Sequence, residues 1–214
     1  MGTTRPVGDP ARRGPAEFVE MDAVEMAAAE LEEASRTTAA FGEQAAEQVA
    51  AIASLVAGAF RSGRRLYAFG NGGSASDAEH LVAELVGRFQ WDRVALPAVA
   101  LTANSAAVTA IANDYGYEEV FARPLSALIQ AGDVAWGFST SGRSRSVLLA
   151  LAAARRAGAR TILFTGAGAP DGLAFDQVLR VPSRITARIQ EGHILAVHVI
   201  CALVDRAVSG WLGV

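Results

Sequence analysis

Short apolar runs alternate with helix-like segments from residue 63 to the end of the chain. Five runs predict strands that are largely buried: LYAFG (66–70), PAVAL (97–101), VAWGF (134–138), TILFTG (161–166) and, nearer an edge, VLRVP (178–182). Apolar residues at helical spacing predict helices over 75–89, 105–113, 118–130, 144–157 and 187–211. This alternation predicts an α/β fold, a three-layer αβα sandwich with a five-stranded parallel sheet.

The N-terminal region has a different pattern. Residues 17–62 are rich in Ala and Glu, with apolar positions at helical spacing, and they predict two helices, over 20–36 and 39–62. Residues 1–18 are rich in Pro, Gly and Arg and predict a flexible tail. Because neither a repeat nor an interdomain linker is visible, we expect one domain over 19–214 that includes the N-terminal helical segment.

Composition narrows the class of protein. Of the 214 residues, 51% are hydrophobic, which is enough for a sizeable core. The net charge of −3 and the lack of a long basic run make nucleic acid an unlikely partner. We expect no membrane span, because no stretch of about 18 apolar residues lacks charge. The N-terminus lacks the apolar region of a secretory signal, which favours a cytoplasmic protein.

Two features of composition exclude particular chemistries. The chain contains no lysine, since all 19 basic residues are Arg, so Schiff-base chemistry, pyridoxal phosphate linkage and a Walker-type phosphate loop are excluded on this chain. The single cysteine, Cys201, cannot form an internal disulfide. Its place in the apolar run HVICALV is more typical of a buried small hydrophobe than of a nucleophile.

Two loops that follow predicted strands have the composition of anion sites. They are GNGGS (70–74) and STSGRS (139–144). Ligands of parallel sheets bind outside the carboxyl ends of the strands. There, glycines allow close backbone approach, while hydroxyls and a helix N-terminus supply donors. Ser and Gly are also ordinary turn and cap residues, but two such loops in one sheet favour phosphate. GNGGSAS lacks the dinucleotide fingerprint, so a nicotinamide cofactor is not expected.

Polar residues on otherwise apolar helices are candidates for chemistry. His80 and Glu84, four apart on one helical face, could bind one metal ion, flank a substrate, or form an ordinary solvated pair. The last helix adds Gln190, His193 and His198. Gln190 and His198 are about 12 Å apart along a helix axis, so they meet at one ion only if both lean toward it. Otherwise the site is assembled between subunits, and His193 remains an alternative ligand.

Four segments carry a family resemblance. FGNGGSASDAEHLVAELVGRF, TAIANDYGYEEVF, STSGRS and RIQEGHILAVH, in this order, resemble the sugar isomerase (SIS) domain and, more closely, the phosphoheptose isomerase family. The resemblance covers about residues 20–205. It implies conversion of sedoheptulose 7-phosphate to D-glycero-D-manno-heptose 7-phosphate. It also implies a homotetramer with active sites at subunit interfaces and one zinc ion per site.

The resemblance also implies roles for individual residues. Zinc would be bound by four side chains, those of His80, Glu84, Gln190 and His198. Glu84 would be the catalytic base and His198 the acid. The sugar phosphate would contact a larger set: Asn71, Gly72, Gly73, Ser74, Glu84, Arg88, Asn113, Asp114, Ser139, Thr140, Ser141, Ser144 and Gln190. Asp77, like Arg88, occupies a matching motif position and is a weaker candidate.

A second function within the same fold must be weighed. A sister protein forms a non-catalytic SIS tetramer that binds the bacterial replication initiator, and segments TARIQE (186–191) and VTAIAND (108–114) resemble it as well. The sister pattern lacks the carboxylate at position 84 and the histidine at position 198, both of which are present here. The sequence therefore favours the isomerase. Ala187 stands where some isomerases carry Asp, a difference that bears on substrate choice.

The chemistry of the reaction explains why a carboxylate is needed. An aldose–ketose isomerase that works through a cis-enediol moves a proton between C1 and C2 and another between O1 and O2. Glu84 is the predicted carrier of the carbon-bound proton. A carboxylate bound tightly to zinc is a poorer base, so the alternatives of base, ligand or both stay open for Glu84.

Overall fold

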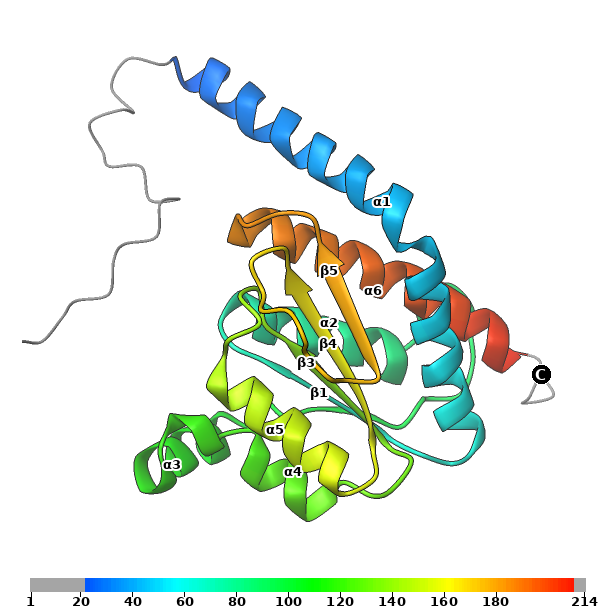
Figure 1. The fold of residues 1–214 in the computed structure, drawn as a ribbon. Helices are drawn as coiled ribbons and strands as arrows, with labels where there is room; N and C mark the ends of the chain where they lie inside the picture. Colours follow the sequence, from blue (N-terminus) through cyan, green and yellow to red (C-terminus); the bar gives the residue numbers. More distant parts are fainter. Residues whose placement is uncertain (1–21, 210–214) are drawn as a thin grey trace, which may run out of the picture.

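A five-stranded parallel sheet forms the centre of the protein, in the order β2-β1-β3-β4-β5. The computed structural model describes residues 22–209 (Figure 1). The strands are β1 Leu66–Gly70, β2 Ala98–Ala100, β3 Val134–Phe138, β4 Arg160–Gly166 and β5 Gln177–Val181. The predicted parallel α/β sheet is confirmed, with β5 at an edge. The predicted tail, 1–18, lies outside the described residues, and the domain boundary stays a prediction.

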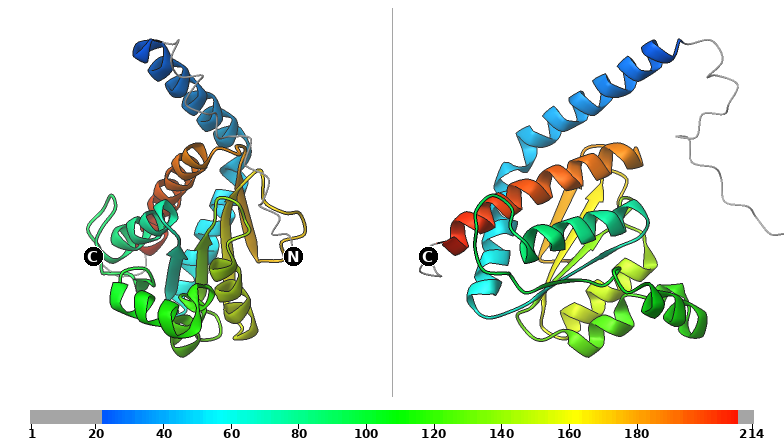
Figure 2. Two further views of the ribbon diagram at one scale, coloured as in Figure 1. Left: turned by 90° about the vertical axis from the view of Figure 1, so that its left-hand side faces the viewer. Right: turned by 180° about the vertical axis from the view of Figure 1, so that it is seen from behind.

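Helices cover both faces of the sheet and complete three layers (Figures 1 and 2). One face is covered by α1 Ala23–Arg61, α2 Gly73–Val86 and α6 Thr186–Ser209. The other is covered by α4 Ala122–Leu128 and α5 Arg145–Arg156, with α3 Ser105–Tyr115 and the short 3₁₀ helix η2 Tyr117–Glu119 beside them. Because alternate strand residues face opposite sides, each face packs its own apolar core.

The N-terminal segment forms one helix, α1, in place of the two helices predicted over 20–36 and 39–62. The predicted break fell at Thr37 and Thr38, which are helical in the structure. A threonine within a helix costs less than about 0.7 kcal/mol relative to alanine. With no proline in this stretch to interrupt the hydrogen bonds, the helix continues. Its first half projects beyond the body of the protein (Figure 2).

The helix predicted over 118–130 is also wrong in its extent. The structure has the single turn η2 followed by the separate helix α4. Pro124 explains the division, since it lacks the N–H that would bond to the carbonyl of Val120 and its ring would clash there. Placed in the first turn of α4 instead, Pro124 costs nothing, because that N–H would have no helical partner.

The last helix, α6, is long and largely apolar. By length and composition alone it could cross a membrane, a test that core helices of soluble proteins also pass. Here α6 packs against α1, α2 and the sheet, and residues such as Ile200 and Val204 are fully buried. We therefore interpret α6 as a core helix. The predicted end at Trp211 lies outside the described residues.

The sheet edges are protected in different ways. On β5, the Gln48 side chain of α1 donates from Nε2 to the Val178 carbonyl, at 2.7 Å. On the opposite edge, β2 has three residues, and Val99 at its centre is 42% exposed. The run PAVAL was predicted to be buried, and the structure corrects this for Val99. A short edge strand leaves few unpaired backbone groups for another chain.

Candidate active site

The two glycine- and serine-rich loops meet at the carboxyl edge of the sheet. β1 leads into residues 70–74 and β3 into residues 139–144, and these two strands are neighbours. The strand order changes direction here, which is where ligands of such sheets bind. Asn71 from the first loop donates from Nδ2 to Ser144 Oγ of the second, at 2.7 Å. The loops thus form one polar surface.

The first loop depends on glycine for its shape. Gly72 has a φ of 58°, a conformation that other residues rarely adopt. A Cβ at Gly70 would lie 2.4 Å from the Ser74 carbonyl oxygen. At Gly73 it would meet the amide of Gln190. The sequence thus brings the backbone of this loop close to its neighbours and leaves the start of α2 open.

We expect the Gly70→Ala variant to be destabilised by about 1–3 kcal/mol, because the new methyl group overlaps the backbone of Ser74. Chemical denaturation measures the change in the free energy of unfolding. The matched control is Gly42→Ala on α1, where a Cβ meets nothing within 4 Å. That control should gain up to about 1 kcal/mol from its better helix propensity. Equal stability of the two variants would contradict the prediction.

Asn71 is the centre of the hydrogen-bond network that joins the loops. Besides Ser144, its amide nitrogen donates to Ser146 Oγ at 3.0 Å, and its oxygen accepts from the hydroxyl of Tyr117 at 2.9 Å. Sequence reasoning missed Ser146 and Tyr117. The repeat of serine in STSGRSRS was the available signal for Ser146. Tyr117, in the segment TAIANDYGYEEVF, had no signal in the sequence that it meets Asn71.

The serine loop is folded on itself and ends at the start of α5. The Gly142 N–H donates to the Ser139 carbonyl at 2.9 Å, with a φ of 63° at Gly142. The N–H of Ser144 donates to Ser139 Oγ at 3.4 Å, and that of Arg143 to Ser141 Oγ at 3.2 Å. Thr140 accepts from the Gly166 N–H through its carbonyl. A helix N-terminus surrounded by hydroxyls suits an anion.

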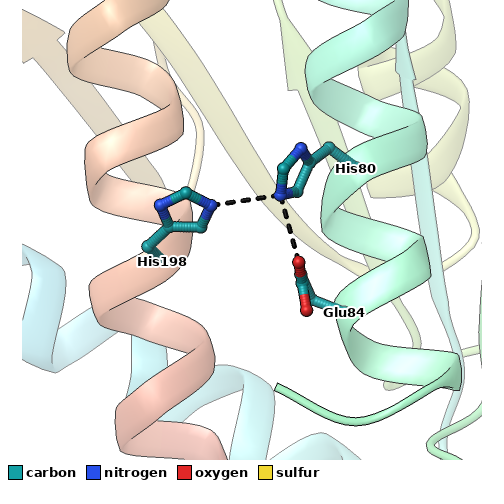
Figure 3. Close-up of side chains that lie close together, drawn as sticks. All are labelled: His80, Glu84 and His198. Atoms are coloured by element: carbon teal, nitrogen blue, oxygen red, sulfur yellow. Dashed lines mark hydrogen bonds and ion pairs between the residues drawn. The ribbon is translucent and has the colours of Figure 1, made fainter. Parts of the chain in front are cut away.

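Three side chains form a compact cluster between α2 and α6 (Figure 3). His80 Nε2 lies 3.1 Å from Glu84 Oε1 and 3.1 Å from His198 Nε2. One ligand atom from each lies within 4.8 Å of the other two. The side chain of His80 is 42% exposed and that of Glu84 is 24% exposed, so a ligand can reach them. We call these three residues the triad.

The donor set of the triad fits a metal ion. Two imidazole nitrogens and one carboxylate oxygen are ligands that zinc uses in catalytic sites, where a fourth position stays open for substrate. The two facing Nε2 atoms can form a hydrogen bond only if one carries a proton. An ion bound by both lone pairs would relieve that requirement.

Gln190 lies away from the triad within this chain. Its amide contacts Gly73 at the start of α2, and His80 lies seven residues, or about 10 Å, further along that helix. Gln190 is also eight residues before His198 on α6. The position beside the glycine loop suits a substrate contact. The assignment of Gln190 as a metal ligand stays a prediction.

His193, the alternative ligand, is part of the core and not of the triad. It is fully buried, and its ring packs against Phe138 and Phe164 with centroids 5.8 and 5.6 Å away. Its Nδ1 lies 3.7 Å from Asp77 Oδ2. Five residues separate His193 from His198, which places them on different faces of α6. Asp77 therefore contacts a buried histidine. It does not occupy the exposed position that a substrate ligand would need.

The remaining predicted substrate contacts lie at several places on the fold. Asn113 and Asp114 are exposed on α3, where Asn113 Nδ2 donates to Asp114 Oδ1 at 2.8 Å. Arg88 is exposed in the coil that follows α2. Ser74 is buried in the first turn of α2. Their roles toward a substrate stay predictions.

The only cysteine of the chain, Cys201, is buried beside the triad. Burial raises the pKa of its thiol to about 12, and the nearby carboxylates of Glu84 and Asp205 act in the same direction. We expect alkylating reagents to leave the native protein unmodified at pH 8, where the thiolate is rare, and to modify it fully after unfolding. Mass spectrometry measures the adduct. Rapid labelling of the native protein would contradict the buried, neutral thiol.

Comparisons with known proteins show the family of the chain. A SIS-domain family model matches residues 31–166. The chain is 52% identical over 167 residues to the phosphoheptose isomerase of Roseiflexus sp. (strain RS-1), covering 77% of this chain and 84% of that one. It is 45% identical over 173 residues to the phosphoheptose isomerase of Geotalea daltonii, covering 79% of this chain and 88% of that one.

Solved structures lead to the same group. The phosphoheptose isomerase of Neisseria gonorrhoeae superimposes with a TM-score of 0.79 at 38% identity, covering 86% of this chain and all of that one. The phosphoheptose isomerase of Francisella tularensis gives a TM-score of 0.84 at 30% identity, covering 87% of this chain and all of that one.

Proposed function

The chain belongs to the phosphoheptose isomerase family of SIS-domain proteins, and from this premise we propose that it converts sedoheptulose 7-phosphate to D-glycero-D-manno-heptose 7-phosphate. The observation that carries the proposal is the triad of His80, Glu84 and His198, formed by α6 and by α2, the helix that starts at the glycine loop. The triad supplies a carboxylate and two imidazoles, which suit a proton-transfer isomerase.

The layout of α2 suits a long sugar phosphate. The helix begins in the glycine loop, whose backbone and neighbouring serines suit the phosphate. His80 and Glu84 lie about 10–16 Å further along its axis. In sedoheptulose 7-phosphate the phosphate is on C7 and the reacting carbons are C1 and C2. A phosphate held at one end therefore leaves the reacting end free to reach the triad.

Each member of the triad has a proposed role. Glu84 moves the carbon-bound proton between C1 and C2 through a cis-enediol, and the imidazole of His198 moves the proton between O1 and O2. His80, 3.1 Å from both partners, orients them. A zinc ion bound here would polarise the substrate carbonyl and stabilise negative charge on its oxygen. His80, Glu84 and His198 would hold it, with Gln190 as the proposed fourth ligand.

The protein's surroundings and assembly are part of the proposal. We infer a cytoplasmic homotetramer in which a second subunit completes each site. The exposed apolar side chains on the projecting half of α1, Val24 and Leu31, support packing against another copy. The non-catalytic alternative, a tetramer that binds the replication initiator, is not favoured because the relatives are named isomerases and the triad is complete.

The test of the proposal is a panel of ketose phosphates. Purified protein is incubated with sedoheptulose 7-phosphate, fructose 6-phosphate or ribulose 5-phosphate, and NMR follows the anomeric proton of the aldose. We expect the protein to turn over the heptulose phosphate and to turn over both shorter sugars more slowly. No aldose from any of the three, together with capture of the replication initiator by the pure protein, would support the binding module.

Asn71 offers a test of the phosphate site. Because its amide holds both serines of the network, we expect Asn71→Ala to raise KM for sedoheptulose 7-phosphate by about tenfold or more, the cost of one hydrogen bond to a charged group. The matched control is Gln48→Ala, which removes an amide hydrogen bond at the far edge of the sheet. Steady-state kinetics measure both. An unchanged KM in Asn71→Ala would reject the proposed phosphate site.

A further inference from the structure

A buried ion pair lies between the two helices that supply the triad. Arg93, in the coil after α2, donates from Nε to Asp205 Oδ1 on α6, at 2.7 Å. The two side chains are 3% and 1% exposed. Replacing a buried pair by apolar residues is often neutral for stability. Its presence therefore calls for a reason other than stability.

Arg93 closes the end of α2 at the residue that carries the triad's carboxylate. Its Nη2 donates to the main-chain carbonyl of Glu84 at 2.8 Å, and its Nη1 donates to those of Leu85 at 2.8 Å and Gly87 at 3.2 Å. These are carbonyls that a helix end leaves without partners. A guanidinium is also favoured there by the negative end of the helix dipole. Arg93 thus fixes the backbone from which Glu84 projects.

Asp205 fixes the same segment from the side of α6. Its Oδ2 accepts from the backbone N–H of Gln90 at 3.0 Å and of Trp91 at 3.5 Å, while Oδ1 accepts from Arg93. Asp205 lies seven residues after His198, two turns along the helix and on the same face. One carboxylate therefore joins the helix of His198 to the end of the helix of Glu84.

We propose that Arg93 and Asp205 are positioning residues that set the separation of α2 and α6, and so hold Glu84 and His198 at the distance that one metal ion and one substrate require. The inference rests on the proposed role of the triad. Neither residue touches the reacting atoms. A site of this kind needs its groups held within about 0.5 Å of the productive geometry, and the pair supplies a directional contact that apolar packing between the helices does not.

The test changes the pair in two ways. The double variant Arg93→Met/Asp205→Leu replaces both charged side chains by apolar ones and removes the hydrogen bonds, and Asp205→Asn keeps the shape of Asp205 and removes its charge. The matched control is Arg160→Met, which breaks the Arg160–Asp176 pair at the far end of the sheet. Each protein is measured in three ways: thermal unfolding, zinc affinity by competition with a chromophoric chelator, and kcat and KM for sedoheptulose 7-phosphate.

We expect the double variant to stay folded but to unfold at a lower temperature, because the backbone groups that the pair bonds lose their partners. It should lose about 10–100-fold in zinc affinity, as variants of residues that support metal ligands do. Its kcat should fall more than its KM rises, because the phosphate loops are untouched. Asp205→Asn should also lose zinc affinity and kcat, and it should unfold at a lower temperature because Arg93 stays buried without a counter-charge. Arg160→Met should match the wild type.

Two results would overturn the positioning role alone. One is a double variant with wild-type zinc affinity and kcat. The other is failure of both Arg93→Met/Asp205→Leu and Asp205→Asn to fold, since the pair would then serve stability. A wild-type protein that binds no zinc and isomerises no heptulose phosphate would instead reject the proposed function, and the positioning role with it.

Discussion

Replacement of Glu84 by Gln should lower kcat for sedoheptulose 7-phosphate by about 10²–10⁴, the usual contribution of a positioned acid or base. Gln keeps the size of the side chain and removes the group that accepts the carbon-bound proton. Because the side chain is 24% exposed and lies at the surface of α2, the fold should be unaffected. A coupled or NMR assay measures kcat, and thermal unfolding checks the fold.

The control for this variant is Glu79→Gln, which removes an exposed carboxylate from the same helix. Glu79 is one residue from His80, so it projects in a different direction. It should keep wild-type kcat and KM. Zinc content of both variants separates the roles of Glu84: loss of turnover with zinc retained indicates a base, and loss of both indicates a ligand. Wild-type turnover in Glu84→Gln would reject both roles.

Removal of the metal should have the second largest effect. Dialysis of the wild-type protein against a strong chelator should lower kcat by about 10²–10³, since a metal acting on a carbonyl is worth several kcal/mol. Zinc should restore the activity. The His80→Ala variant, which lacks one of the three clustered ligands, should remain slow after zinc is returned.

Metal analysis of the dialysed protein and its kinetics must be read together. Turnover at the wild-type rate by protein free of metal would show that the triad acts through its side chains alone. Recovery of His80→Ala to the wild-type rate on addition of zinc would place the ion elsewhere. Either outcome contradicts the assignment of the triad as the metal site.

Much of the fold was predictable because its strands are bounded by strong local signals. Strands 66–70 and 134–138 were predicted with their observed bounds, since each is an apolar run that ends at a glycine- or serine-rich loop. The break predicted within α1 was wrong, because weak helix formers such as Thr37 cost too little to stop a helix that no proline interrupts. Local propensity gives too little energy to decide such positions.

The candidate site was predictable in part for a similar reason. His80 and Glu84 are four apart on one helix, so their proximity follows from helical geometry. His198 lies 118 residues from His80 in sequence, so its approach depends on how α6 packs against α2. This approach was predicted through the family resemblance. Arg93 and Asp205 carried no motif, and only the packed structure shows that they meet.

One measurement tests the proposed isomerase most directly: the wild-type reaction of sedoheptulose 7-phosphate in D₂O, followed by NMR. If Glu84 carries the proton between C1 and C2, the base exchanges with solvent, and the heptose 7-phosphate that forms carries deuterium at C2. Absence of the heptose would contradict the proposed activity. Formation of the heptose at the full rate without any deuterium from solvent would contradict the proton-transfer role of Glu84.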